Sequence, residues 1–317
     1  MEIFVENFIY SINATLPIFL LMILGKVLYK LHIVNDDFVK GADRYVYYVA
    51  LPTLVFKDLT ENNIRDTFDG GYVLFCFLVT LLVILTIWGM TELFMKDNSE
   101  KGAFIQASYR SSAAILGLAF IDNMYSSAGM APLMIIGAVP LFNIFAVVIL
   151  TIKGDNGGQK PKLKTTIKNI FKNPILLGIL IALPFAFLDV TFPTFVNKGI
   201  SSLAATASPL ALLSIGAGFE GRKAIKKIKP TAIASFIKLI LLCAVFLPLA
   251  IHFGYRNQEL VGILIMLGSP ATVSCYIMAK NTKNDATLTS SIIVLTTLLS
   301  SVTLTMWIYL LKTMGYL

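Results

Sequence analysis

The chain has few charged residues for its length. Asp, Glu, Lys and Arg make up 14% of its 317 residues, whereas hydrophobic residues make up 56%, and the mean hydropathy is +0.78. Soluble domains carry about 25% charged residues, so this composition excludes an ordinary soluble domain. A membrane span needs about 20 apolar residues. Ten such stretches, joined by short links, can be placed at 7–30, 38–57, 70–94, 102–124, 131–152, 174–190, 194–219, 230–253, 259–280 and 286–312.

Cysteine is also rare, and enzyme motifs are missing. Cys76, Cys243 and Cys275 all fall inside expected spans, and their spacing fits neither a disulfide framework nor a metal site. His32 and His252 fall at span ends, which favours interfacial positions over proton relays. The motifs of metalloproteases, α/β-hydrolases and nucleotide-binding P-loops do not occur. We therefore expect no enzyme, no metal and no cofactor, so any gradient coupling must use the membrane itself.

The net charge of +8 is distributed as in a membrane protein. Glu2 and Glu6 precede the first span without Lys or Arg, the reverse of a cleavable signal peptide, which predicts an exported N-terminus. The odd-to-even links then face the cytoplasm, where Lys and Arg are enriched. They hold Lys30, Lys40, Arg44, Lys96, Lys101, Lys153, Lys160, Lys162, Lys164, Lys168, Lys172, Arg222, Lys223, Lys226, Lys227, Lys229, Lys280 and Lys283, against Lys57, Arg65, Lys198, Arg256 and Lys312 in the opposite links and C-terminus. We expect a multi-pass protein of the cell (inner or plasma) membrane with both termini outside, in contact with anionic lipid headgroups and without a nucleic-acid partner.

One polar linker, 153–173, divides the chain into a first unit of five spans (1–152) and a second unit of five spans (174–317). Its Gly, Asn, Pro and Lys residues are typical of a solvated loop on the cytoplasmic side. Because five is odd, the second unit enters the membrane in the opposite sense, so any repeat is inverted. Ala50-Leu-Pro52-Thr-Leu-Val-Phe56 and Ala207-Ser-Pro209-Leu-Ala-Leu-Leu213, in the second span of each unit, support such a repeat.

The fourth span of each unit is interrupted by polar residues and helix breakers. These segments read Gln106-Ala-Ser-Tyr-Arg110-Ser-Ser-Ala-Ala-Ile-Leu-Gly117 and Gly268-Ser-Pro270-Ala-Thr-Val-Ser274-Cys-Tyr276. Polar backbone at membrane depth survives only where protein or a water-filled cavity satisfies it. A matched pair of interrupted spans indicates the binding site of a carrier. Pro270 removes a helical hydrogen bond, so we expect a break there; a kinked but continuous helix is the alternative.

Arg110 lies about 12 Å into the bilayer, where a guanidinium costs at least a few kcal/mol. Three interpretations stay open: snorkelling to the headgroups, an anion-attracting charge at a cavity, and a structural ion pair. Ser111, Ser112 and Gly117 follow, and a break there would free donors for a carboxylate. Serines that bond to their own helix are the alternative. In the opposite span, Ser269, Pro270, Thr272 and Ser274 are expected to line the same cavity.

Other polar residues in the spans have less specific interpretations. Asn143 is expected either to hold helices together or to contact a substrate. Lys238 is about nine residues from the cytoplasmic end of its span, which favours snorkelling. Asp43 and Arg44 open the second span and are expected at the interface. Near the external ends of spans, Lys57, Asp58, Asp122 and Asp189 are expected to be rim charges.

At these residues the sequence resembles the auxin efflux carrier family, over nearly the whole chain. The likeness is most specific in the two interrupted segments and in Thr296-Thr-Leu-Leu-Ser-Ser-Val-Thr-Leu304. It implies an all-α integral membrane fold of ten transmembrane helices, arranged as two inverted five-helix repeats with broken, crossing helices 4 and 9. It also implies an elevator-like or rocking cycle and homodimers. Family members often carry Asn where Ser112 stands. The short central loop is similar to bacterial members, which implies malate- or malonate-type substrates rather than auxin.

Together these observations predict a secondary carrier of small organic acid anions, mono- or dicarboxylates, that works by alternating access. Ser111, Ser112, Ser269, Thr272 and the backbone around Pro270 are expected to bind the carboxylate. Arg110 would supply positive potential and Asn143 would position the crossing. Two alternatives remain: a sodium-coupled bile-acid-type symporter, disfavoured by the scarcity of carboxylates near the crossing, and a membrane-embedded solute sensor. The coupling ion, proton or sodium, is open.

Overall fold

The computed structural model describes residues 2–60, 69–113, 121, 124–125, 131–154, 163–188, 190 and 192–317, and all regular elements within these ranges are helical. Two of them, η1 and η3, are π-helical turns between α-helical segments. The elements are α1 (Glu2–Lys30), α2 (Asp36–Tyr45), η1 (Val46–Ala50), α3 (Leu51–Thr60), α4 (Gly70–Phe94), α5 (Asn98–Tyr109), α7 (Ala131–Lys153), α8 (Leu163–Phe171), α9 (Pro174–Phe187), α10 (Thr194–Ala205), α11 (Ala207–Gly218), α12 (Gly221–Lys226), α13 (Ile228–Phe236), η3 (Ile237–Leu241), α14 (Leu242–His252), α15 (Asn257–Gly268), α16 (Ser274–Asn281) and α17 (Ala286–Thr313).

Five helices in the described part of the chain are long and apolar enough to cross a membrane: Gly70–Phe94, Leu133–Lys153, Thr194–Gly218, Ile228–His252 and Ala286–Thr313. Helix α4 shows why such helices suit a bilayer. Leu74, Leu78 and Leu82 form a stripe along its exposed side, whereas Val79 and Val83 are buried. Contiguous exposed apolar surface of this kind is unusual on soluble proteins. The ten-span inverted repeat expected from the sequence stays a prediction.

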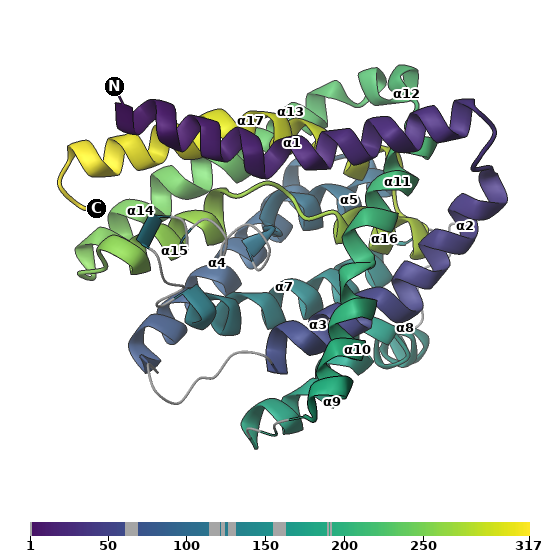
Figure 1. The fold of residues 1–317 in the computed structure, drawn as a ribbon, viewed down its shortest axis with the longest axis horizontal. Coiled ribbons are helices and arrows are strands. Elements are labelled where there is room, and N and C mark those ends of the chain that lie inside the picture. Colours follow the sequence, from purple (N-terminus) through teal and green to yellow (C-terminus); the bar gives the residue numbers. More distant parts are fainter. Residues whose placement is uncertain are drawn as a thin grey trace.

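The two units of the chain pack into one another. Helix α1 lies against α11 and α17 of the second unit, and α3 lies against α9 and α10 (Figure 1). Glycines make the closest of these approaches possible. A Cβ atom at Gly25 would collide with the backbone of Leu213, and one at Gly216 with the backbone of Met22. Small residues allow this backbone approach between membrane helices. Among the described residues, the two hydrophobic clusters each draw side chains from both units.

Helical structure is interrupted at both places where the sequence predicts it. Helix α5 ends at Tyr109, and residues 110–112 are not helical. Helix α15 ends at Gly268, and α16 begins only at Ser274. The alternative of a kinked but continuous helix at Pro270 is therefore wrong.

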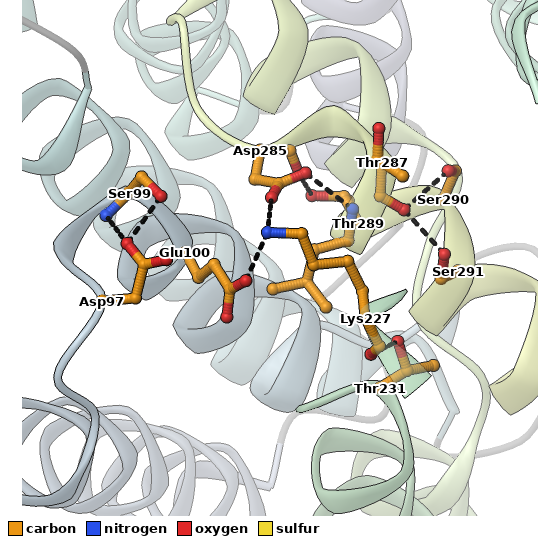
Figure 2. Close-up of polar contacts among 11 residues, drawn as sticks. Asp97, Ser99, Glu100, Lys227, Thr231, Asp285, Thr287, Thr289, Ser290 and Ser291 are labelled. Carbon is orange, nitrogen blue, oxygen red and sulfur yellow. Dashed lines mark hydrogen bonds and ion pairs between the residues drawn. The ribbon is translucent and has the colours of Figure 1, made fainter. Parts of the chain in front are cut away.

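Ion pairs join helix ends on one side of the molecule. Lys227, between α12 and α13, pairs with Glu100 in the first turn of α5 and with Asp285, the N-cap of α17, the latter at 3.1 Å (Figure 2). Asp97 caps α5 by accepting a hydrogen bond from the Ser99 N–H at 2.9 Å. Carboxylates at helix N-termini satisfy free N–H groups and complement the helix dipole. These contacts fix the start of α5, and so the direction in which it approaches the break.

Candidate functional site

The backbone of the two breaks is completed by contacts between them. Pro270 has no N–H, so the carbonyl of Met266, four residues earlier, lacks its helical donor; the Ser111 hydroxyl donates to it instead. In return, the Ser112 N–H donates to the carbonyl of Pro270 at 3.0 Å. Each break thus supplies a hydrogen-bond partner to the backbone of the other. Buried polar groups require such partners. One further group is satisfied from outside the two breaks: the Ala271 N–H donates to Thr296 Oγ1 of α17 at 3.2 Å.

A cavity of about 50 Å³ lies at this junction. It brings together six of the nine residues that the sequence predicts for the site: Arg110, Ser111, Ser112, Asn143, Thr272 and Ser274. The other lining residues are mostly apolar: Leu51, Leu54, Val55, Asp58, Ala113, Val139, Phe142, Ile175 and Met278. Asp58 is the only carboxylate among these lining residues of the described chain. A polar patch with apolar walls is typical of small-molecule sites.

Three predicted site residues do not line the cavity. Ser269 is fully buried beside it, and its hydroxyl has no hydrogen-bond partner in the described ranges. Pro270 contributes through its backbone, whose carbonyl accepts from Ser112. Gly117 lies outside the described residues, as do Asp122 and Asp189 among the expected rim charges.

Arg110 points into the protein, with 4% of its surface exposed. Its Nη2 donates to Asn143 Oδ1 at 2.8 Å, and its Nη1 contacts Met278 Sδ at 2.7 Å. Its Nε has no partner, and no ion pair to Arg110 is formed by the described residues. The snorkelling interpretation is therefore wrong, and no structural ion pair replaces it here. Arg110 is a permanently charged group held by neutral partners.

Asn143 connects helix α7 to the first break. Its Oδ1 accepts from Arg110, and its Nδ2 donates to the carbonyl of Val139, one turn earlier, at 3.0 Å. The side chain thereby orients the guanidinium toward the cavity. In the second break, the hydroxyls of Thr272 and Ser274, which also line the cavity, lie 3.3 Å apart. Hydroxyl and amide groups and one guanidinium thus line the cavity from three segments of the chain.

Two interpretations from the sequence are wrong because the residues are buried. Lys238 was expected to snorkel, but it is fully buried, and its Nζ donates to the carbonyls of Tyr109 and Leu267 and to the Ser111 hydroxyl. Asp43 was expected at the interface, but only 3% of it is exposed, and it pairs with Lys280 of α16. The partners of both residues are distant in sequence, so no local pattern identifies these contacts.

A larger cavity, of about 980 Å³, lies between α4 and α13–α14. Its walls are mostly apolar, with Lys96, Asp97, Glu100 and Lys229 gathered among its lining residues. None of the predicted site residues lines it. The residues that the sequence predicts for the site therefore gather at the smaller cavity.

Comparison with known proteins identifies the family. A family profile described as "Membrane transport protein" matches residues 10–308. The chain belongs to the auxin efflux carrier family. This confirms the resemblance in the interrupted segments, and it makes the chain a multi-pass membrane transport protein.

Two prokaryotic relatives of this auxin efflux carrier family member are similar to it over nearly their whole length, and a mammalian relative is similar over part of its length. It is 23% identical over 305 residues to an uncharacterized transporter of Methanocaldococcus jannaschii, covering 93% of this chain and 97% of that protein. It is 25% identical over 316 residues to a Rhizobium meliloti protein named "Putative malonate transporter", covering 95% of each. It is 24% identical over 251 residues to the Lysosomal cholesterol signaling protein of Mus musculus, covering 74% of this chain and 29% of that protein.

Proposed function

We propose that the protein is a secondary carrier of small organic acid anions, mono- or dicarboxylates of the malate or malonate type. One observation carries this proposal: the buried guanidinium of Arg110 lines a polar cavity and has only neutral hydrogen-bond partners. An uncompensated buried charge costs several kcal/mol. Asp58 also lines the cavity, but Arg110 forms no ion pair among the described residues. A carboxylate bound in the cavity would form that ion pair and could accept a hydrogen bond from Nε.

The hydroxyls around the cavity add to this argument. Ser112, Thr272 and Ser274 can donate to the second oxygen of a carboxylate or to a second carboxylate group. The Rhizobium relative, by its name, supports an organic dianion as substrate. The cavity of about 50 Å³ is smaller than the roughly 300–1,000 Å³ of ordinary ligand sites. Binding therefore requires the junction to widen, which fits alternating access.

The proposal includes the membrane arrangement expected from the sequence. Ten transmembrane helices would form two inverted five-helix repeats, 1–152 and 174–317, joined by the cytoplasmic linker 153–173, with both termini outside the cell membrane. The fourth helix of each repeat would be the broken, crossing one, and two copies would form a homodimer among membrane lipids. The basic links and the positions of the two breaks support this arrangement.

The first test is a thermal stability screen of the purified protein with mono- and dicarboxylates, with and without sodium and at two pH values. A ligand that binds only the folded state raises the midpoint temperature in proportion to its occupancy. We expect a dicarboxylate to do so, and Arg110→Gln to weaken its binding about 10- to 100-fold, because a hydrogen bond to a charged group contributes about 1.5–3 kcal/mol. Lys198→Gln, at an exposed lysine of α10, is the control.

Uptake of labelled malonate into proteoliposomes then tests transport itself. Ser112→Ala is expected to reduce uptake while leaving the folded protein nearly as stable as wild type, since its hydroxyl makes no hydrogen bond within the described ranges. Wild-type uptake in both Arg110→Gln and Ser112→Ala would refute the site assignment. Uptake that strictly requires external sodium would favour the bile-acid-type symporter, and saturable binding without uptake would favour a sensor.

A further inference from the structure

Lys238 is a buried cation that the proposed substrate site does not use directly. It lies in the π-helical turn η3, it is fully buried, and its Nζ lies 2.7 Å from the carbonyl oxygen of Leu267 and 3.2 Å from that of Tyr109. Its third partner is the hydroxyl of Ser111. π-Helical turns are rare and occur often at functional sites. The carbonyl of Leu239 in this turn is satisfied by the indole N–H of Trp307 at 3.1 Å.

The partners of Lys238 are the ends of two helices. Tyr109 is the last residue of α5, and Leu267 is the penultimate residue of α15. The last carbonyls of a helix have no partner within it, and each helix C-terminus carries about half a negative charge. The ends of α5 and α15 together therefore offer about one negative charge to one ammonium group. This explains how the charge is tolerated without a carboxylate.

No carboxylate bonds to Lys238 among the described residues. The thiols of Cys243 on α14 and Cys275 on α16 are ionisable groups that interact with its ammonium. Arg110 follows Tyr109 directly and adds a second positive charge. The three oxygens around Nζ are thus two carbonyls at helix C-termini and one hydroxyl. Broken helices of secondary transporters use this kind of oxygen set to coordinate a sodium ion.

We propose that the ammonium group of Lys238 is a tethered cation in a sodium-like site, so that the carrier completes the junction of its broken helices without binding sodium. The inference rests on the proposed function for its role in transport. Ser111 connects the two places, because its hydroxyl accepts from Lys238 while the residue lines the substrate cavity. The fixed ammonium holds the ends of α5 and α15 together and gives the adjacent cavity positive potential.

The test measures the thermal stability of purified protein in sodium chloride and in choline chloride at equal ionic strength, without any organic anion. Lys238→Ala empties the site and leaves its three oxygens in place, whereas Lys238→Met fills it with a neutral side chain of similar length. We expect the wild type to be indifferent to sodium. The midpoint of Lys238→Ala should be lowered in choline and rise with the logarithm of sodium concentration once sodium exceeds its Kd. Lys238→Met should be lowered and remain indifferent.

Two results would overturn the inference: Lys238→Ala as stable as wild type in choline, or sodium and choline acting alike on it. If Lys238→Ala does not fold in either salt, the wild-type titration decides, because a sodium-dependent rise in its midpoint refutes a tethered cation. If the proposed function holds, malonate uptake by the wild type is independent of sodium, and uptake by Lys238→Ala becomes dependent on it. The stability experiment contains no organic anion, so absence of malonate uptake alone would count against the proposed function and not against the tethered cation.

Discussion

Ser111→Ala tests how the two broken helices are joined. The Ser111 hydroxyl accepts from the ammonium of Lys238 and donates to the Met266 carbonyl, which Pro270 leaves without a helical donor. The substitution removes both contacts while adding no bulk. Ser108, one turn earlier in α5, is also fully buried, but its hydroxyl donates to the carbonyl of Phe104 in its own helix at 2.7 Å. Ser108→Ala is therefore a matched control.

The expected magnitudes differ by several fold. A hydrogen bond to a charged group contributes about 1.5–3 kcal/mol, and a buried carbonyl left without a donor costs about 1–3 kcal/mol. Because Lys238 keeps two other acceptors, we expect Ser111→Ala to cost about 2–5 kcal/mol. The Phe104 carbonyl is within a continuous helix and keeps its backbone donor. Ser108→Ala loses only a local bond, which alanine's helix propensity partly offsets, so it should cost less than about 1 kcal/mol.

The measurement is thermal unfolding of both variants and the wild type in one detergent, with monodispersity checked by size exclusion. Ser111→Ala should lower the midpoint at least two to three times as far as Ser108→Ala. Equal shifts would show that the Ser111 hydroxyl does not join the breaks, and they would refute the account in which Pro270 creates the need for it.

Two further predictions concern the break at Pro270 and the N-cap of α5. Pro270→Ala restores a backbone N–H that competes for the Met266 carbonyl, and it should extend α15 across the break. Malonate uptake should then fall about tenfold or more in protein that still folds. Unchanged uptake would contradict a functional break. Asp97 accepts hydrogen bonds from the side chain and backbone of Ser99, which lowers the pKa of its carboxyl group. Its contribution to stability is therefore present above the unfolded pKa of about 4 and is lost as the pH falls through the lower folded value. Asp97→Asn keeps a capping oxygen but cannot titrate, so the difference in midpoint temperature between wild type and this variant should shrink from pH 6 to pH 3; a constant difference would show that the cap does not titrate.

The interruption at Pro270 was predictable because its cause is local. Pro270 removes a helical hydrogen bond wherever it stands in a helix, and Gly268 and Ser269 before it weaken the same turn. The pairing of this segment with Arg110–Ser112 followed from their matching positions in the two units. The structure brings six of the predicted residues to one cavity, while their role in binding stays a prediction.

Lys238 and Asp43 could not be predicted from their neighbours in sequence. Asp43 lies near a span end, and the long side chain of Lys238 can extend toward one from about nine residues inside its span. On an isolated helix, a charged group that reaches water costs less free energy than one that is buried. Burial became favourable only because distant segments provide partners. The carbonyls that accept from Lys238 belong to α5 and α15, and the cation that pairs with Asp43 belongs to α16.

The sequence by itself determined the class of protein, the interrupted segments and the family. Hydropathy, Pro and Gly decide the local structure of a few neighbouring residues, and a family motif is a run of consecutive residues, so all of these signals are visible along the chain. Only the tertiary structure decided which charges are buried and what compensates them. Whether Arg110 or Lys238 faces lipid, water or a carbonyl depends on which helix ends converge on it, and that is set by packing between residues more than 100 positions apart, as with Lys238 and Tyr109.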